Sequence, residues 1–236
     1  MRGADRKMDY FGNFVRFVER FFPPDFSVFE EVWKGLLESI QMAVVATAMA
    51  ILASLPLAVA GARTISPIWL VGIARMGLNI IRTVPGLVWA LFAVAIFGAN
   101  ALAGVVGLAV YSVGYLGKFF SDALESVDMD AAVGLRAMGA HPLQAFQYGL
   151  WPYVKPLVWS YSLWMLEYNI RSASIIGYVG AGGVGLLLFT YQQYYQWDKF
   201  CTALLSILVL VTVLDLVGEW ARKKVAKRVY RPLGSK

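Results

Sequence analysis

Two charged side chains stand within an otherwise apolar stretch of this 236-residue sequence, and they carry its clearest chemistry. Glu167 and Arg171 lie four residues apart, in the acid-before-base order that favours pairing on a helix. Ionisable groups in long apolar segments are costly and usually serve a ligand or ion pathway. We therefore favour a pathway contact for an anionic ligand over an internal ion pair that only fixes packing. Ser172 and Ser174 add hydroxyls, whereas Asn169 points to another side of the helix.

A glycine-rich stretch follows these polar residues, and its glycines are Gly180, Gly182, Gly183 and Gly185. The stretch satisfies the pattern G-x-G-x-x-G, but a dinucleotide site also needs a preceding strand and an open α/β sheet, and neither is predicted here. Two readings remain equally favoured. The small residues allow close helix packing, or they form a partly unwound segment that borders a pathway.

The sequence offers little for catalysis or for metal binding. His141 is the only histidine, and no group of Cys, Asp and Glu shows metal-ligand spacing around it. No Ser–His–Asp or paired-carboxylate arrangement is present. Cys201, the only cysteine, lies in an apolar run and is read as a small core residue. We expect a chain without catalytic residues and without a metal or other cofactor of its own.

Composition defines the class of protein to which these residues belong. Hydrophobic residues make up 59% of the chain and charged residues only 15%, and the mean hydropathy is +0.61. A soluble domain carries about 25% charged residues. The chain is therefore predicted to be all-α, a polytopic helical membrane protein with about five transmembrane helices, additional interfacial helices and one exposed helical elbow.

Uncharged runs locate the spans, because about 20 apolar residues are needed to cross a bilayer. The five predicted spans are Ser39–Ala62, 85–98, 101–120, 152–176 and 200–217. Residues 8–34 alternate aromatic and charged side chains, and we predict that residues 1–34 form an amphipathic segment on the membrane surface. Residues 68–82 are similar and are expected on the cytoplasmic surface or along a cavity. Their Arg75 and Arg82 share one helical face, where snorkelling to headgroups is favoured over a role in ligand exit.

Positive charge gathers at the two ends of the chain. Of the 21 lysines and arginines, six lie in residues 1–34 and seven in residues 221–236. The basic tail, residues 223–236, is predicted to be cytoplasmic by the positive-inside rule, and contact with anionic lipid is favoured over nucleic-acid binding. Five spans then place the N-terminus outside, which conflicts with its own basic residues.

The elbow, which we define as residues 128–148, is the most informative segment between the spans. Asp128 is a good N-cap and the following ten residues favour a helix. Gly139 stands where a left-handed residue would end that helix. His141 and Pro142 resemble the N-cap and first-turn proline of a second helix. The apolar face with Ala131, Leu135 and Met138 predicts a protein partner.

Here the sequence resembles a known family. Residues 130–152 are similar to the EAA loop of ABC importer permeases, with Pro152 at the family's distance after Gly139. The family's glutamate is replaced by Val133, and Asp130-Ala131-Ala132 stands three residues early. Arg82-Thr83-Val84-Pro85 resembles the family's Arg-x-x-Pro segment. Glu167-Tyr-Asn-Ile-Arg-Ser, with the glycine stretch, resembles the phosphonate-importer branch, and the similarity covers about residues 35–222.

The resemblance implies a type I importer fold, with a permease domain at 35–222 that contains a cytoplasmic coupling loop at about 121–150. It implies a permease that transports a phosphonate, phosphite or phosphate ion. The implied partners are ABC ATPase subunits, an extracytoplasmic binding protein, a second permease copy and membrane lipid, in a bacterial or archaeal plasma membrane. ATP and magnesium would bind the ATPase, since this chain has no G-x-x-x-x-G-K-[ST] loop.

The resemblance also assigns residues to two roles. Those expected to contact the ATPase are Asp130, Ala131, Leu135, Arg136, Met138, Gly139, Ala140 and His141. Those expected along the translocation pathway are Glu167, Asn169, Arg171, Ser172, Ser174, Gly180, Gly182 and Gly183. The alternatives left open are a methionine-type amino-acid importer, an integral-membrane enzyme and a stand-alone channel.

Overall fold

The computed structural model describes residues 10–229, with side-chain surroundings up to residue 223. These residues form helices and no strand, so the predicted all-α fold is confirmed for them. The long or membrane-depth helices are α2 (Phe29–Gly61), α3 (Ile68–Thr83), α4 (Gly86–Phe97), α5 (Ala101–Ser126), α8 (Trp151–Ile176), α9 (Gly183–Gln193) and α10 (Trp197–Val229). The shorter elements are α1 (Tyr10–Phe21), α6 (Asp130–Ala137), α7 (Pro142–Ala145), two 3-10 turns (Phe26–Val28 and Gly177–Val179) and a π turn (Phe146–Leu150).

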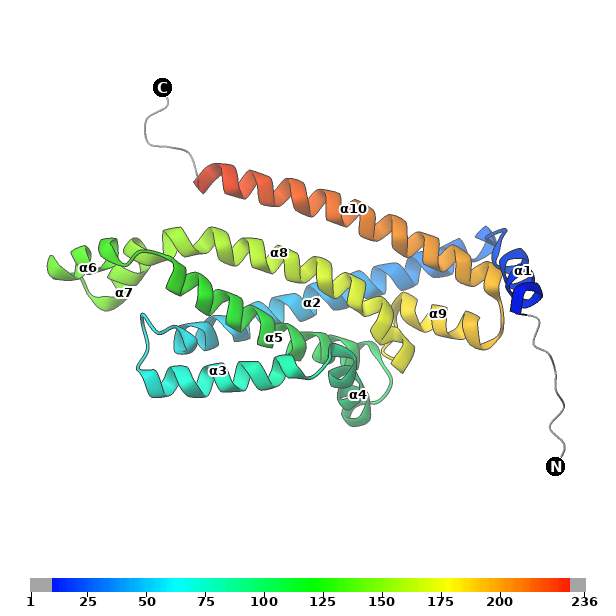
Figure 1. Ribbon diagram of the computed structural model, residues 1–236, viewed down its shortest axis with the longest axis horizontal. Helices are drawn as coiled ribbons and strands as arrows, with labels where there is room; N and C mark the ends of the chain where they lie inside the picture. Colours follow the sequence, from blue (N-terminus) through cyan, green and yellow to red (C-terminus); the bar gives the residue numbers. More distant parts are fainter. Residues whose placement is uncertain (1–9, 230–236) are drawn as a thin grey trace, which may run out of the picture.

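The long helices run along one axis of an elongated bundle (Figure 1). At one end, which we call the elbow end, α6 and α7 project beyond α5 and α8. At the other end, the α1 end, α1 packs on the start of α10 through Phe17 and Trp197, whose ring centroids lie 5.1 Å apart. The basic residues predicted at the extreme ends, within 1–9 and 230–236, lie outside the described part of the chain.

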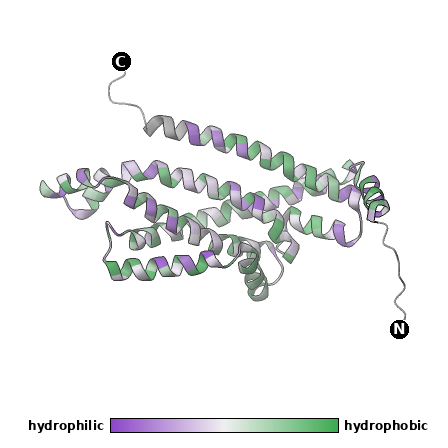
Figure 2. Ribbon diagram, viewed as in Figure 1, coloured by the Kyte–Doolittle hydropathy of each residue, from purple (hydrophilic) through white to green (hydrophobic). Residues whose placement is uncertain are grey.

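Up to five crossings are supported within the described residues. Three segments are long and apolar enough alone: Phe26–Gly61, Ala101–Ser126 and Trp197–Lys223. Two bent helix pairs bring the number to five if each pair is one broken span and not a re-entrant loop: α3 with α4 at 88°, and the Pro142–Val179 segment with α9 at 44°. Hydrophobic residues cover most of α10 (Figure 2).

The structure corrects the prediction for residues 68–98. The compact span expected at 85–98 is wrong, because the 12 residues of α4 rise only about 18 Å against a hydrocarbon core of about 30 Å. Of the two locations expected for 68–82, the cytoplasmic surface is wrong, since α3 runs lengthwise beside α5 (Figure 1), and the position along a cavity stays a prediction. Pro85 separates the two helices and has no N–H for the Ile81 carbonyl, which the Trp89 indole N–H satisfies at 3.1 Å.

Small residues bring α2 against the rest of the bundle. Its buried positions include Gly35, Ser39, Ala43, Ala46, Thr47, Ala50, Ser54, Ala58 and Gly61, every third or fourth residue. This spacing places one small-residue stripe toward α5, α8 and α9 and lets the backbones approach closely. Residues 29–34 belong to α2, so the predicted boundary between residues 34 and 35 falls inside a continuous helix.

Candidate functional site

The elbow has the predicted helix–glycine–helix form. The Asp128 carboxylate accepts a hydrogen bond from the Asp130 N–H at 3.0 Å, which starts α6. Gly139 has φ +90°, and the Ala140 N–H that follows it donates to the Leu135 carbonyl at 3.0 Å. A residue with a side chain is strained in this left-handed conformation, so the glycine sets the direction in which the chain leaves α6.

The predicted capping role of His141 is confirmed. Its Nδ1 accepts from the Leu143 N–H at 3.3 Å, and its own N–H donates to the Gln144 side chain at 3.0 Å. Pro142 occupies the first turn, where no N–H is needed. The π turn then leads directly into α8, so the second helical part of the elbow, from Pro142 onward, is a continuous extension of that helix.

The elbow exposes apolar side chains at the end of the bundle. Met138, Leu143 and Val133 expose 78%, 71% and 59% of their surfaces. Of the residues predicted to contact a partner, Leu135 and Ala140 are half-buried and the other six are exposed. Val133 and Leu143 were missed, although both are apolar residues beside the predicted face. Ala132 of α6 packs closely on Gly149, just after the elbow. A Cβ added to Gly149 would lie only 2.7 Å from the Cα of Ala132.

Glu167 and Arg171 do not pair with each other, so the less favoured reading, an internal ion pair, is wrong, and the pathway contact stays a prediction. Both side chains face α10, where Glu167 pairs with Arg222 and Arg171 pairs with Asp215 at 3.2 Å. Gly218 provides the space for the Glu167 carboxylate, since a Cβ at that position would overlap it. The side chains of Arg171 and Asp215 are about half exposed, and that of Glu167 only 12%. The charges therefore connect two helices rather than two turns of one helix.

Asn169 lies in the core of the bundle and is fully buried. Its amide nitrogen donates to the Thr47 hydroxyl at 2.9 Å, and its carbonyl oxygen accepts from the Ser112 hydroxyl at 3.0 Å. It thereby links α2, α5 and α8. The predicted pathway position of Asn169 is not what the fold shows, because its side chain reaches no surface of this subunit.

The glycine stretch shows both close packing and a break between helices, and its position along a pathway stays a prediction. Gly180, Gly182 and Gly183 have φ of +86°, +83° and +68° and separate α8 from α9. Close packing occurs as well, because a Cβ on Gly183 would overlap the Ser39 hydroxyl, which accepts from the Val184 N–H at 3.0 Å. The nearby Ser172 and Ser174 are half-buried.

The two arginines of α3 make contacts inside the subunit. Arg75 forms an ion pair with Glu125 at 2.6 Å and donates to the Gly61 carbonyl at 2.9 Å. Arg82 packs its guanidinium over the Tyr115 ring at 4.8 Å. Snorkelling was favoured from sequence because contacts of α3 with α5 and α2 are not visible in a hydropathy pattern.

This geometry defines the class of protein: a multi-pass helical membrane protein with an exposed elbow at one end. The chain belongs to the family of binding-protein-dependent transport system inner membrane components, whose profile matches residues 50–229. It is therefore a non-catalytic permease component of an ABC transporter, and such a permease works with ATPase and substrate-binding partners.

Individual relatives and solved structures agree with this family. A phosphite transport system permease protein of Stutzerimonas stutzeri is 38% identical over 202 residues, 85% of this chain and 74% of the relative. A phosphate-import permease protein of Mycolicibacterium smegmatis is 31% identical, over 91% of this chain and 40% of the relative. The inward-facing MetNI methionine ABC transporter superposes with TM-score 0.72 at 25% identity, over 82% of this chain and 95% of that chain.

Proposed function

We propose that the chain transports a phosphorus oxyanion such as phosphite, phosphate or a phosphonate, as the permease of an importer. The support for the ligand class comes from relatives named for phosphite and phosphate transport at 38% and 31% identity. The methionine-type alternative rests on a likeness of fold, and the sequence relatives favour the oxyanion. A bacterial or archaeal plasma membrane, with surrounding lipid, is the proposed location.

The elbow is the observation that carries the proposed mechanism. An ATPase subunit would bind its exposed apolar side chains, among them Met138 and Leu143, at the cytoplasmic end of the bundle. Movement of the ATPase would tilt α8, because the elbow continues into that helix without an intervening loop. The two ion pairs between α8 and α10 would then move α10 with it.

The opposite end would face the binding protein. With the elbow in the cytoplasm, five crossings place α1 and Tyr194, which is 72% exposed, at the outer surface. The aromatic side chains of α1, such as Phe11 and Phe14, are exposed and would enter the interfacial region of the bilayer. A second permease copy would complete the pathway between the two subunits.

The test is ATP-dependent uptake by the assembled importer. The chain, with an ATPase and a binding protein from its own organism, is reconstituted in proteoliposomes and supplied with phosphite, phosphate, methylphosphonate or methionine. We expect uptake of at least one phosphorus oxyanion that requires ATP and the binding protein. Methionine uptake alone would replace the ligand assignment, and oxyanion flux through the isolated chain without ATP would support a channel instead.

A further inference from the structure

Arg82 has no carboxylate partner among the described residues, unlike four other cations of the bundle. The cations with a carboxylate partner include Arg75 with Glu125, Lys118 with Asp122, Arg171 with Asp215 and Arg222 with Glu167. The Nε of Arg82 is buried without any hydrogen-bond partner. A buried charged donor without a hydrogen-bond partner costs free energy in a membrane protein unless a polar group or a ligand binds it.

The guanidinium lies over one end of a connected group of aromatic side chains from α5 and α8. Tyr115 lies under it, and the Tyr111 ring is 4.7 Å from that of Tyr115 and stacked at 5.5 Å on that of Tyr168. Trp164 stacks on Tyr168 at 5.8 Å and meets Phe119 edge-on at 5.7 Å. We call these side chains the Arg82 cluster: Arg82, Tyr111, Tyr115, Phe119, Trp164 and Tyr168.

The cluster keeps its positive charge and a free hydroxyl donor. A tyrosine ring attracts a cation through its quadrupole but does not neutralise it. The Tyr111 and Tyr168 hydroxyl oxygens are 3.0 Å apart, and Tyr111 also has a hydrogen bond with the Tyr115 side chain. Two of the three O–H groups serve these bonds, and the third remains available to an acceptor. Both features suit an anion with several acceptor oxygens.

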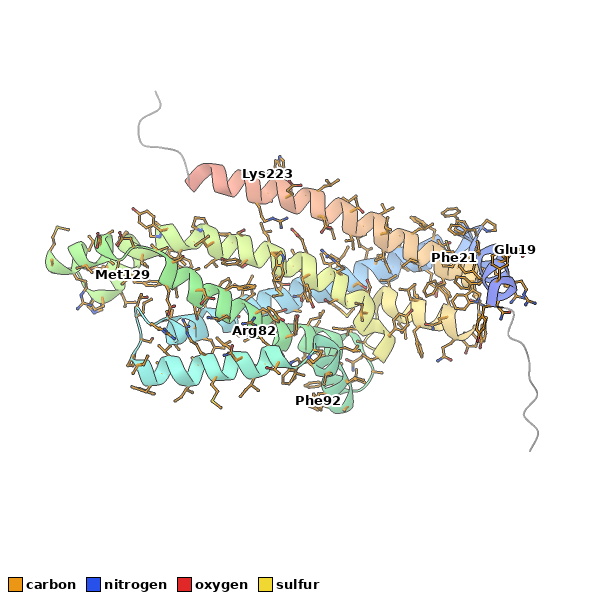
Figure 3. The ribbon with its side chains drawn as sticks, viewed as in Figure 1. Glu19, Phe21, Arg82, Phe92, Met129 and Lys223 are labelled. Atoms are coloured by element: carbon orange, nitrogen blue, oxygen red, sulfur yellow. The ribbon has the colours of Figure 1, made fainter. Side chains whose placement is uncertain are left out.

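The position of the cluster fits an intermediate point of a pathway. Arg82 lies near the middle of the long axis, between Met129 toward the elbow end and Phe21 at the α1 end (Figure 3). Trp164 exposes 40% of its surface, and Tyr115, Phe119 and Tyr168 are only partly buried, so this face of α5 and α8 is not sealed within the subunit.

We propose that the Arg82 cluster is a transient binding site for a tetrahedral oxyanion in transit, with Arg82 and a tyrosine hydroxyl as its donors. This inference rests on the proposed function and names the residues that receive the ligand. A single cation without a second charged partner binds weakly, which permits release toward the cytoplasm. Arg171, chosen from sequence, is less suited because Asp215 already offsets its charge.

The single cysteine of the chain allows a direct test. Cys201→Ala gives a cysteine-free background, in which Arg82→Cys is assembled with the ATPase and binding protein in proteoliposomes. Loss of a charged hydrogen-bond donor predicts phosphite uptake reduced about tenfold or more. A cationic thiol reagent should restore uptake severalfold, a neutral reagent of equal size should not, and excess phosphite should slow the labelling.

The controls separate this site from the importer assignment. Lys118→Gln removes a nearby cation whose charge Asp122 already balances, and its phosphite uptake should remain within about threefold of the parent. If the parent complex moves no phosphorus oxyanion, the proposed function fails. If the parent moves phosphite and Arg82→Cys moves it equally, or if neutral and cationic reagents act alike, the site is rejected and the function stands.

Assembly is checked through copurification with the ATPase. Where Arg82→Cys does not assemble, Arg82→Lys replaces it, since that variant keeps the charge. Uptake within about threefold of the parent supports the anion site, whereas a loss of tenfold or more in an assembled Arg82→Lys complex assigns Arg82 to packing on Tyr115.

Discussion

Asn169 illustrates how far the role of a single residue depends on which side of a helix it occupies. It lies two residues from Glu167 and two from Arg171, yet it faces the core while the two charges face α10. Polar side chains between membrane helices act as cross-links, because the alternative is an unsatisfied group in an apolar medium. We therefore assign Asn169 to holding α2, α5 and α8 together through Thr47 and Ser112.

Replacing Asn169 with Leu should lower the free energy of unfolding in detergent by about 1–2 kcal/mol, because two interhelical hydrogen bonds are lost. Denaturant unfolding measures this change. Ser162→Ala is the matched control, since the buried Ser162 hydroxyl bonds only to the Val158 carbonyl of its own helix. Equal losses from the two variants would contradict a cross-linking role.

The elbow is the element whose shape depends most on local sequence. Its caps and its turn use neighbouring residues only: Asp128 at the start of α6, Gly139 after it and His141 before α7. Two glycines on this element differ in one respect. Gly134 and Gly139 both have open space where a Cβ would be, but only Gly139 has a positive φ.

This difference makes a matched pair of variants. Gly139→Ala forces a side chain into the left-handed region, which costs about 1–2 kcal/mol. The elbow conformation that binds the ATPase should therefore become about 5- to 30-fold rarer, and ATP-driven uptake should fall. Gly134→Ala introduces a better helix former and should leave uptake intact. ATPase binding and uptake are measured for both. Normal uptake by Gly139→Ala, and equally by the bulkier Gly139→Val, would reject the elbow as the coupling element.

The two ends of the whole molecule lie far apart, which agrees with an odd number of crossings, and the outer location of the N-terminus stays a prediction that its own basic residues oppose. The elbow end and the α1 end are opposite ends of the bundle, as an odd number of crossings requires (Figure 1). Acidic residues accompany the basic ones at the α1 end. Asp25 lies there, and hydrogen bonds from Ser27, aided by the charge of Lys199, lower the pKa of its carboxyl group.

The orientation can be tested with the single-cysteine approach. In the Cys201→Ala background, Tyr194→Cys places a thiol at the α1 end and Met138→Cys places one at the elbow, both at exposed positions. A membrane-impermeant maleimide should label Tyr194→Cys in intact cells and Met138→Cys only after permeabilisation. The reverse pattern would place the elbow outside and remove the proposed contact with an ATPase.

Features determined by neighbouring residues were predictable from sequence alone. Apolar run length predicted helix α8 and most of α2, α5 and α10, and the capping residues predicted the elbow, because hydropathy and capping act over a few residues. Tertiary structure decided the rest. The partners of Glu167, Arg171 and Asn169 lie 55, 44 and up to 122 residues away, and the lengthwise position of α3 follows from its contact with α5. These pairings depend on which helix faces meet, and only the packed bundle specifies that.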